Sequence, residues 1–148
     1  MPRRLRRLSL SLKRETAIAA TRVTIGKDRL VYVLVADKRL KYNFGKSRIA
    51  YIGTTKKGLS RISQSVASRA DQILSTPGVR SFSARIVTCK RRRKVKTWHK
   101  LERALLLEFK ERFQSVPTCN RKGIRMKETD EFRYFSKSAV RNVIDELV

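Results

Sequence analysis

The chain has 148 residues, with 37 Lys or Arg against 12 Asp or Glu, so its formal net charge at pH 7 is +25. The length suits one domain with a real core, and 41% hydrophobic residues indicate a globular rather than a disordered protein. No apolar run approaches the ~20 residues that a membrane-spanning helix needs. Solubility requires a net charge of only ~2–8, so the excess indicates a polyanionic partner. Nucleic acid is the usual one, and an anionic membrane or another acidic partner is the alternative.

The N-terminal residues 1–14 are rich in arginine and contain no acidic residue. They lack the apolar core of about 7–15 residues that a secretory signal needs. We therefore expect residues 1–24 to form a basic arm and residues 25–148 to form a single domain. A mitochondrial transit peptide and an anchor for an anionic membrane share this composition and stay open.

The first half of the domain predicts two strands and a helix. Residues 29–36 are β-branched and aromatic without a helical period, which indicates a buried strand. Residues 37–47 are interpreted as a polar, basic connection to a second, antiparallel strand over residues 48–54. A helix is predicted over residues 58–75, because its apolar residues recur at steps of three and four. These residues are Leu59, Ile62, Val66, Ala70 and Ile73.

The next segment predicts a third strand and a second helix. Residues 80–88 alternate between apolar and polar side chains, as a half-buried strand does. A dense cationic run over residues 90–100 follows, in which Thr97 is the expected N-cap of a helix over residues 98–113. The predicted core stripe of that helix consists of Trp98, Leu101, Leu105 and Phe109.

The C-terminal segment is interpreted as a short edge strand over residues 131–135 and a final helix over residues 138–147. Strands followed by helices predict an α+β fold. We expect a small three-stranded antiparallel sheet flanked by helices, with a basic N-terminal arm and a C-terminal helix.

Ligands for a structural metal are scarce, because the chain has only Cys89, Cys119 and His99. A closed zinc site takes four cysteines or histidines, usually in close pairs. Two buried thiols are the expectation, with a disulfide left open, and the histidine is interpreted as a helix-surface residue.

Carboxylates are equally few between residues 38 and 127, where only Asp71, Glu102, Glu108 and Glu111 occur. Glu102 follows the core stripe of its helix directly, whereas the other three are expected to be solvated charges. A two-metal site needs several clustered carboxylates. The sequence therefore favours at most a site with one carboxylate and one metal.

Aromatic and cationic residues gather around the end of the second strand. Tyr51-Ile52-Gly53 is followed by Lys56, Lys57 and, near the predicted helix start, Arg61. A helix N-terminus favours an anion, and a guanidinium can hold two phosphate oxygens. On composition alone, a surface arginine is the simpler interpretation. A tyrosine, Tyr32 included, has an ordinary pKa of about 10, which nearby cations are expected to lower.

In the order of these motifs, roughly over residues 29–125, the chain resembles the GIY-YIG nuclease family. The YIG element is present literally as Tyr51-Ile52-Gly53, and the GIY element is degenerate as Leu30-Val31-Tyr32. Many members carry a histidine where this chain has Ser65. The further matches are Arg61 in GLSRI, Glu102 in KLERALLLEF and Asn120 in PTCNRKG.

The resemblance implies a divalent-metal-dependent DNA endonuclease that hydrolyses phosphodiester bonds. It implies that Arg61 stabilises the charged phosphate and that Glu102 holds a single Mg²⁺ or Mn²⁺ ion. It also implies that Tyr32 accepts a proton from water or relays it. The remaining implied site residues are Tyr51 beside Tyr32, Lys56 or Lys57 as a second contact to the phosphate, and Asn120 as the fastener of its loop.

The expected partner is DNA, with a homodimer for double-strand cutting, no membrane, and a cytoplasmic or nucleoid-associated location. The alternative is a non-catalytic, basic DNA- or RNA-binding protein on a nuclease-like fold. A pure binder has no need of Glu102 in a cationic groove, which favours the enzyme. The expected nucleic-acid contacts are Lys56, Lys57, Arg91, Arg92, Arg93 and Lys96.

Overall fold

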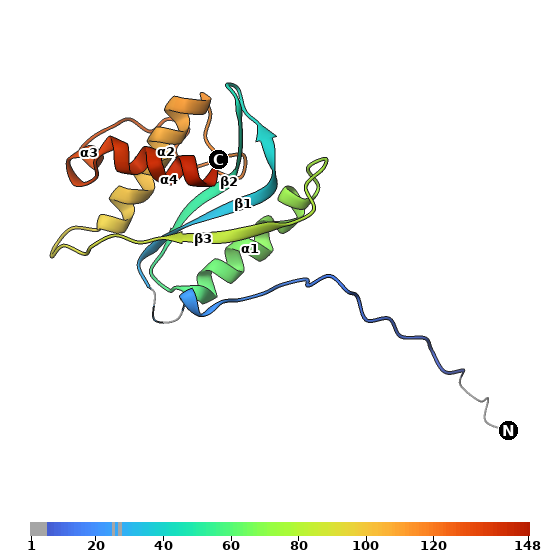
Figure 1. Ribbon diagram of the computed structural model, residues 1–148. Helices are drawn as coiled ribbons and strands as arrows, with labels where there is room; N and C mark the ends of the chain where they lie inside the picture. The colour runs from blue at the N-terminus through green and yellow to red at the C-terminus, as the bar shows by residue number, and fades with distance from the viewer. Residues whose placement is uncertain (1–5, 25, 27) are drawn as a thin grey trace.

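The structure is a computed structural model that describes residues 6–24, 26 and 28–148. The first five residues of the predicted basic arm lie outside the described residues. Residues 6–21 leave the domain as an exposed chain without helix or strand, and a short turn of 3₁₀ helix, η1 (Arg22–Thr24), follows (Figure 1). Among the described residues, no helix combines the length and the apolar character needed to cross a membrane.

The domain is built on a three-stranded antiparallel sheet, which confirms the predicted fold class. The central strand β1 (Leu30–Lys41) pairs on one side with β2 (Lys46–Thr55) and on the other with β3 (Phe82–Val87). The interpretation of residues 37–47 as a connection is wrong for most of its length. Both strands continue through it because pairing extends to the end of the hairpin, and only residues 42–45 form the turn.

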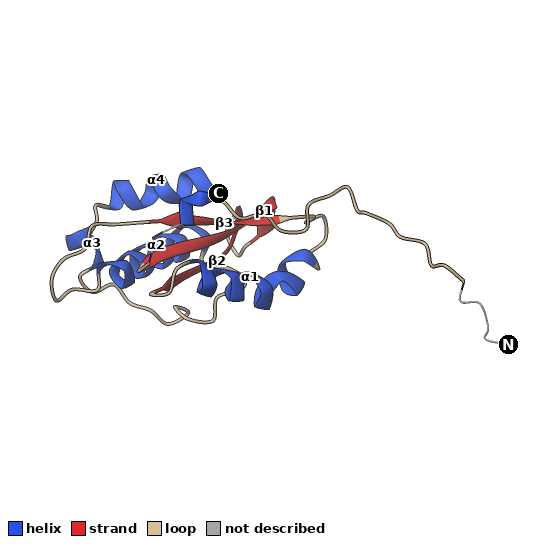
Figure 2. Ribbon diagram, turned by 90° about the horizontal axis from the view of Figure 1, so that it is seen from below, coloured by secondary structure: helices blue, strands red, loops and turns tan. Residues whose placement is uncertain are grey.

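Helices cover both faces of the sheet, which is why β1 is apolar without alternation (Figure 2). Helix α1 (Leu59–Leu74) packs on one face. Helices α2 (Thr97–Phe113) and α4 (Lys137–Leu147) pack on the other face. Each face encloses its own hydrophobic core, and the layers run helix, sheet, helix.

Two details of the helices differ from the sequence prediction. Lys96, not Thr97, is the N-cap of α2, and the Thr97 hydroxyl donates a hydrogen bond of 2.8 Å to the Lys90 carbonyl instead of capping. In α1, Leu59 is 41% exposed, whereas Ser65 is 3% exposed. The buried face of α1 is therefore rotated towards Ser65 relative to the predicted stripe.

The predicted edge strand over residues 131–135 is wrong, because this segment is the single-turn helix α3 (Glu131–Tyr134). Glu131 is fully buried and accepts a hydrogen bond of 2.6 Å from Arg103 Nε of α2, which fixes the segment as a turn. Cys89 and Cys119 carry free thiols that are half-buried rather than buried as expected.

Candidate active site

Gly53 allows two tyrosine rings to lie together over the β1–β2 ladder. Tyr32 stands opposite Gly53 in the register, and the ring centroids of Tyr32 and Tyr51 lie 5.8 Å apart. A Cβ atom at residue 53 would lie 2.5 Å from Tyr51 Cε1 and 2.9 Å from Tyr32 Cζ. The glycine is therefore required by this close approach, and it positions both phenols.

Tyr51 is held between β2 and α1. The guanidinium carbon of Arg69 lies 3.7 Å from the centroid of the Tyr51 ring, and Arg69 Nη1 donates a hydrogen bond of 2.9 Å to Ser65 Oγ. Burial raises the pKa of Tyr51 to about 12, with a contribution from Tyr32, and the charge of Arg69 opposes this only in part. The expectation that nearby cations lower a tyrosine pKa is therefore wrong for Tyr51, because desolvation outweighs them.

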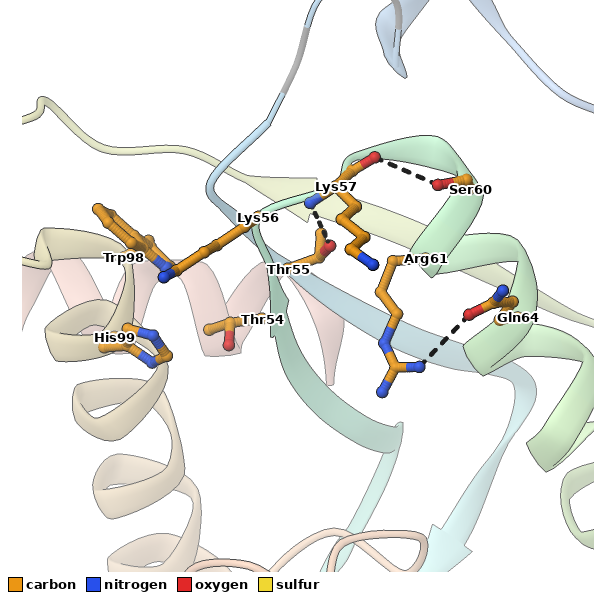
Figure 3. Close-up of a pocket in the computed structure, with 9 residues that line it drawn as sticks. All are labelled: Thr54, Thr55, Lys56, Lys57, Ser60, Arg61, Gln64, Trp98 and His99. Carbon is orange, nitrogen blue, oxygen red and sulfur yellow. Dashed lines mark hydrogen bonds between the residues drawn. The ribbon is translucent and has the colours of Figure 1, made fainter.

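A pocket of about 400 Å³ opens beyond the end of β2 (Figure 3). Gly58, with φ of 65°, turns the chain from the strand into α1 and places Arg61 in the first helical turn. Lys57 and Arg61 extend into a common space, and Arg61 Nη1 donates a 3.4 Å hydrogen bond to the amide oxygen of Gln64. No acidic residue is among the lining residues Thr54, Thr55, Lys56, Lys57, Ser60, Arg61, Gln64, Trp98 and His99.

His99 forms the opposite wall of this pocket, which corrects its interpretation as a helix-surface residue. The start of α2 lies beside the β2–α1 turn, so Trp98 and His99 face the side chain of Lys56 (Figure 3). Sequence reasoning missed His99 as a site residue. The available signal was its place one helical turn before Glu102, on the same face of the helix.

The environment of His99 favours the neutral imidazole. Burial lowers its pKa below 6.5, Glu102 opposes the shift, and the charges of Lys122, Lys96 and Lys56 reinforce it. A neutral imidazole can accept a proton at physiological pH, which an ammonium or a guanidinium cannot do.

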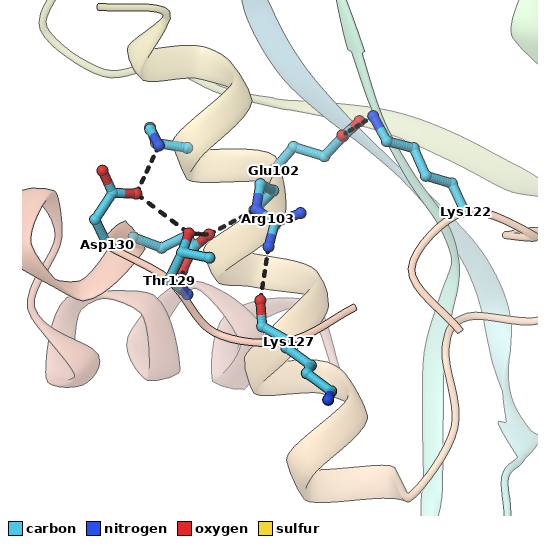
Figure 4. Close-up of polar contacts among 8 residues, drawn as sticks. Glu102, Arg103, Lys122, Lys127, Thr129 and Asp130 are labelled. Carbon is cyan, nitrogen blue, oxygen red and sulfur yellow. Dashed lines mark hydrogen bonds and ion pairs between the residues drawn. The ribbon is translucent and has the colours of Figure 1, made fainter. Parts of the chain in front are cut away.

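Glu102 lies on α2 one turn beyond His99 and is 4% exposed. Its Oε1 atom pairs with the Nζ atom of Lys122 at 2.9 Å (Figure 4). The charge of Glu102 acts on both Tyr51 and His99. The carboxylate therefore influences the protonation of both Tyr51 and His99.

A metal ion at this place would be held by Glu102. Within the described parts of the chain, no group of three or more His, Cys, Asp or Glu side chains could hold a metal ion. Mg²⁺ keeps several water ligands and is commonly held by one or two carboxylates together with substrate phosphates. The chemistry of the Glu102 carboxylate therefore fits a hydrated Mg²⁺ or Mn²⁺ ion.

The other acidic candidates take no part in this arrangement. Asp71 and Glu111 are exposed, as predicted. Glu108 is 5% exposed, so its interpretation as a solvated charge is wrong. Helix α4 packs over that side of α2 and brings Arg141 Nε to 3.4 Å from Glu108 Oε1.

Asn120 fastens the loop after α2 to the outer edge of β2. Its Oδ1 atom accepts a hydrogen bond from the Ile52 amide, and its Nδ2 atom donates one to the Ile52 carbonyl, both at 2.9 Å. The Cys119 amide donates a third bond of 2.9 Å to the Ala50 carbonyl. Asn120 is 7% exposed, so the loop seals the edge of β2 that carries Tyr51.

A second polar network ties α3 to α2 (Figure 4). Burial by itself raises the carboxyl pKa of Glu131, but hydrogen bonds donated by Arg103 and Thr129 outweigh it and hold the pKa at about 2. Beside them, Lys100 Nζ pairs with Asp130 at 2.5 Å. These contacts tie residues 127–131 to the helix that carries His99 and Glu102.

The predicted nucleic-acid contacts divide between two places. Lys56 and Lys57 line the pocket. Arg91 forms an ion pair with Asp28, and the guanidinium carbon of Arg92 lies 5.5 Å from the ring centroid of Tyr134. The four predicted contacts in the cationic run, Arg91, Arg92, Arg93 and Lys96, are all exposed.

Comparison with known proteins gave one match. The family model described as the T5orf172 domain matches residues 29–148, which is most of the chain. Searches among curated proteins and among solved structures found no match.

Proposed function

The chain belongs to the T5orf172 domain family, a nuclease-like family related to endonucleases of the GIY-YIG and HNH types, and we propose that it is a divalent-metal-dependent DNA endonuclease. It hydrolyses phosphodiester bonds through a one-metal site of the GIY-YIG type. The observation that carries this proposal is the pocket itself. Two lysines of the β2–α1 turn, an arginine of the first turn of α1 and a neutral imidazole line this pocket, and the imidazole lies one helical turn before a buried carboxylate.

The cations of the pocket bind the scissile phosphate. Lys56, Lys57 and Arg61 are exposed, and none of them pairs with a carboxylate among the described residues. Arg61 lies in the first turn of α1, where the helix dipole also favours an anion. Its guanidinium stabilises the charge that develops on the phosphate oxygens in the transition state.

In this proposal, His99 is the base that accepts the proton of the attacking water. Its imidazole lines the pocket and is neutral at pH 7. Tyr51, with a pKa of about 12, is a poor base. Tyr32, to which the resemblance assigns this role or that of a relay, is 2% exposed and does not line the pocket.

Glu102 holds the metal ion and Asn120 keeps the wall of the site in place. A bound divalent ion supplies charge neutralisation at the phosphate and the leaving oxygen. The carboxylate of Glu102 is buried on α2, and its charge acts on Tyr51 and His99. The hydrogen bonds of Asn120 to Ile52 hold the strand that carries Tyr51.

The net charge of +25 supports DNA as the partner. The exposed run of Arg91, Arg92, Arg93 and Lys96 supplies contacts to the backbone beyond the pocket. One pocket cuts one strand, so cutting of both strands takes two protomers, which we propose as a homodimer on DNA.

One observation favours the alternative of a non-catalytic DNA- or RNA-binding protein. The carboxylate of Glu102 is already paired with Lys122, so its charge is satisfied without a metal ion. A protein that only binds nucleic acid would be complete in this state.

Incubation of the purified protein with supercoiled plasmid in Mg²⁺ or Mn²⁺ tests the proposal. The arms are EDTA, Glu102→Gln, Arg61→Ala and the control Arg39→Ala. Arg39 is an exposed arginine on the hairpin half of β1 and does not line the pocket. We expect nicking or linearisation that disappears in EDTA and in the first two variants, while the control cuts normally.

The binding of the same variants to DNA separates catalysis from attachment. Arg61→Ala is expected to bind nearly as well as the wild type, because its charge acts mainly on the transition state. Binding without cutting of plasmid, branched DNA or RNA in either metal would establish the non-catalytic alternative.

A further inference from the structure

Glu102 is a buried carboxylate whose counter-ion comes from a mostly exposed side chain. The Glu102 side chain is 5% exposed and the Lys122 side chain is 64% exposed, and 2.9 Å separates Lys122 Nζ from Glu102 Oε1 (Figure 4). The two side chains therefore differ in conformational freedom. The helix fixes the carboxylate, while the ammonium reaches it from a loop.

The loop keeps Lys122 within reach without fixing it. Asn120, two residues before it, is anchored to Ile52 by two hydrogen bonds of 2.9 Å. The lysine side chain has four rotatable bonds and reaches the carboxylate from the solvent side. Moving the ammonium into solvent therefore costs little free energy for Lys122 itself. It would, however, leave the buried charge of Glu102 without a partner.

We propose that Lys122 is an internal counter-ion that competes with a divalent metal ion for Glu102. In the free protein the ammonium neutralises the carboxylate, and it leaves when a metal ion takes its place. This inference rests on the proposed function for its ligand class, a hydrated Mg²⁺ or Mn²⁺ ion, and for the phosphate in the neighbouring pocket.

The surroundings of the pair support an exchange of cations at one place. The charges of Glu102 and Lys122 both act on His99, in opposite directions. The pocket beside them is lined by further lysines and an arginine. If the ammonium stayed beside Glu102, it would repel a metal ion at the same carboxylate. Tight metal binding therefore requires that the ammonium leave.

On the proposed function the neighbouring pocket holds a phosphate, and the charge of Lys122 already acts on His99 in the wall of that pocket. The lysine then moves from one anion, the carboxylate of Glu102, to another, the phosphodiester. The free protein is therefore expected to bind divalent ions weakly and to bind them more tightly together with nucleic acid.

Calorimetric titration with Mn²⁺ in the absence of DNA tests the competition. We expect Lys122→Met to bind Mn²⁺ at least tenfold more tightly than the wild type. The matched control is Lys127→Met, an exposed lysine of the same loop whose side chain points away from Glu102 (Figure 4). Both variants remove one positive charge, so a difference between them is not a general effect of charge.

His99 gives a second, local measurement, because it is the only histidine of the chain. Paramagnetic Mn²⁺ at Glu102 broadens the imidazole NMR signal of His99. Half-broadening is expected at a Mn²⁺ concentration at least tenfold lower in Lys122→Met than in the wild type or in Lys127→Met. Addition of Glu102→Gln to Lys122→Met should abolish the broadening.

Folding of Lys122→Met gives a third readout. The unpaired carboxylate should make the variant melt earlier than the wild type in EDTA, and Mn²⁺ should restore it. A variant that is unfolded in EDTA and recovers its circular dichroism spectrum with Mn²⁺ supports the proposal, and one that stays unfolded with Mn²⁺ contradicts it.

Equal Mn²⁺ affinity in the wild type and Lys122→Met, or no Mn²⁺ binding in either, would overturn the inference. Its failure is distinct from failure of the nuclease proposal, because none of these measurements uses cleavage. Tight Mn²⁺ binding by Lys122→Met, together with no cleavage of DNA by the wild type, would support Lys122 as the counter-ion and contradict the proposal of an endonuclease.

Discussion

Replacement of Asn120 by alanine should destabilise the domain by removing the clamp on β2. Asn120 satisfies both the amide and the carbonyl of Ile52 at 2.9 Å and is 7% exposed. A buried backbone group left without its partner costs about 1–3 kcal/mol. With partial access of water to the opened edge, we expect a loss of about 3 kcal/mol in the free energy of unfolding, or a Tm lower by roughly 6–12 °C.

The assay is urea unfolding followed by circular dichroism, with Asn43→Ala as the control. Asn43 Nδ2 also donates to a distant backbone carbonyl, that of Gln114 at 3.0 Å, but at an exposed site. The control should stay within ~0.5 kcal/mol of the wild type, because exposed substitutions have small effects. Equal losses in the two variants would refute the view that burial makes Asn120 a clamp.

Gly53→Ala places a methyl group 2.5 Å from Tyr51 Cε1, so overpacking should cost ~1–3 kcal/mol of stability and alter the near-UV circular dichroism of the tyrosines. An unchanged near-UV spectrum would mean that the rings have room for the methyl group. The carboxyl pKa of Glu131, held at about 2 against an ordinary 4.5, stabilises the fold above pH ~4.5, and this stability is lost as the pH falls towards 2. Denaturant titrations should find a lower free energy of unfolding for Glu131→Gln at pH 7, and a smaller change in that free energy between pH 4.5 and 2 than in the wild type. If the free energy of the variant falls as steeply with pH as that of the wild type, the acid sensitivity belongs to other carboxylates. Because burial lowers the pKa of His99 below 6.5, the cleavage rate should be level around neutral pH and fall only in acid. His99→Gln should slow cleavage by ~10²–10⁴-fold and remove that acid limb, and a variant with the wild-type pH profile would exclude the imidazole as the base. Neutralisation of ~6 phosphates predicts that log K for DNA falls with log salt at a slope of about −5, and a salt-independent affinity would contradict the cationic contacts.

The periodicity of the sequence determined most of the secondary structure. The two strands of the hairpin, β3 and the three longer helices begin and end within a few residues of their predicted bounds, except where the hairpin strands extend through residues 37–47. Long periodic segments specify their own type, because a buried face must repeat with the period of its backbone. The family resemblance rested on the same regularities, since Tyr51, Arg61, Glu102 and Asn120 stand at fixed places on these elements.

Short segments were decided by their neighbours. The alternating aromatics of residues 131–135 suit a strand, but the segment forms a helical turn in which the buried Glu131 pairs with the partly exposed Arg103. Five residues are too few for a period to distinguish the two. Similarly, Glu108 becomes buried only because α4 packs against that side of α2.

The candidate site shows the same division. The sequence determined which side chains are available: the cations after β2, the carboxylate on α2 and a net charge that attracts nucleic acid. Only the tertiary structure decided their states, because proximity and desolvation depend on elements far apart in the chain. His99 lines the cationic pocket because α2 begins beside the β2–α1 turn. Burial set the pKa of Tyr51 at about 12, and the loop after α2 gave Glu102 the ammonium of Lys122 as its counter-ion.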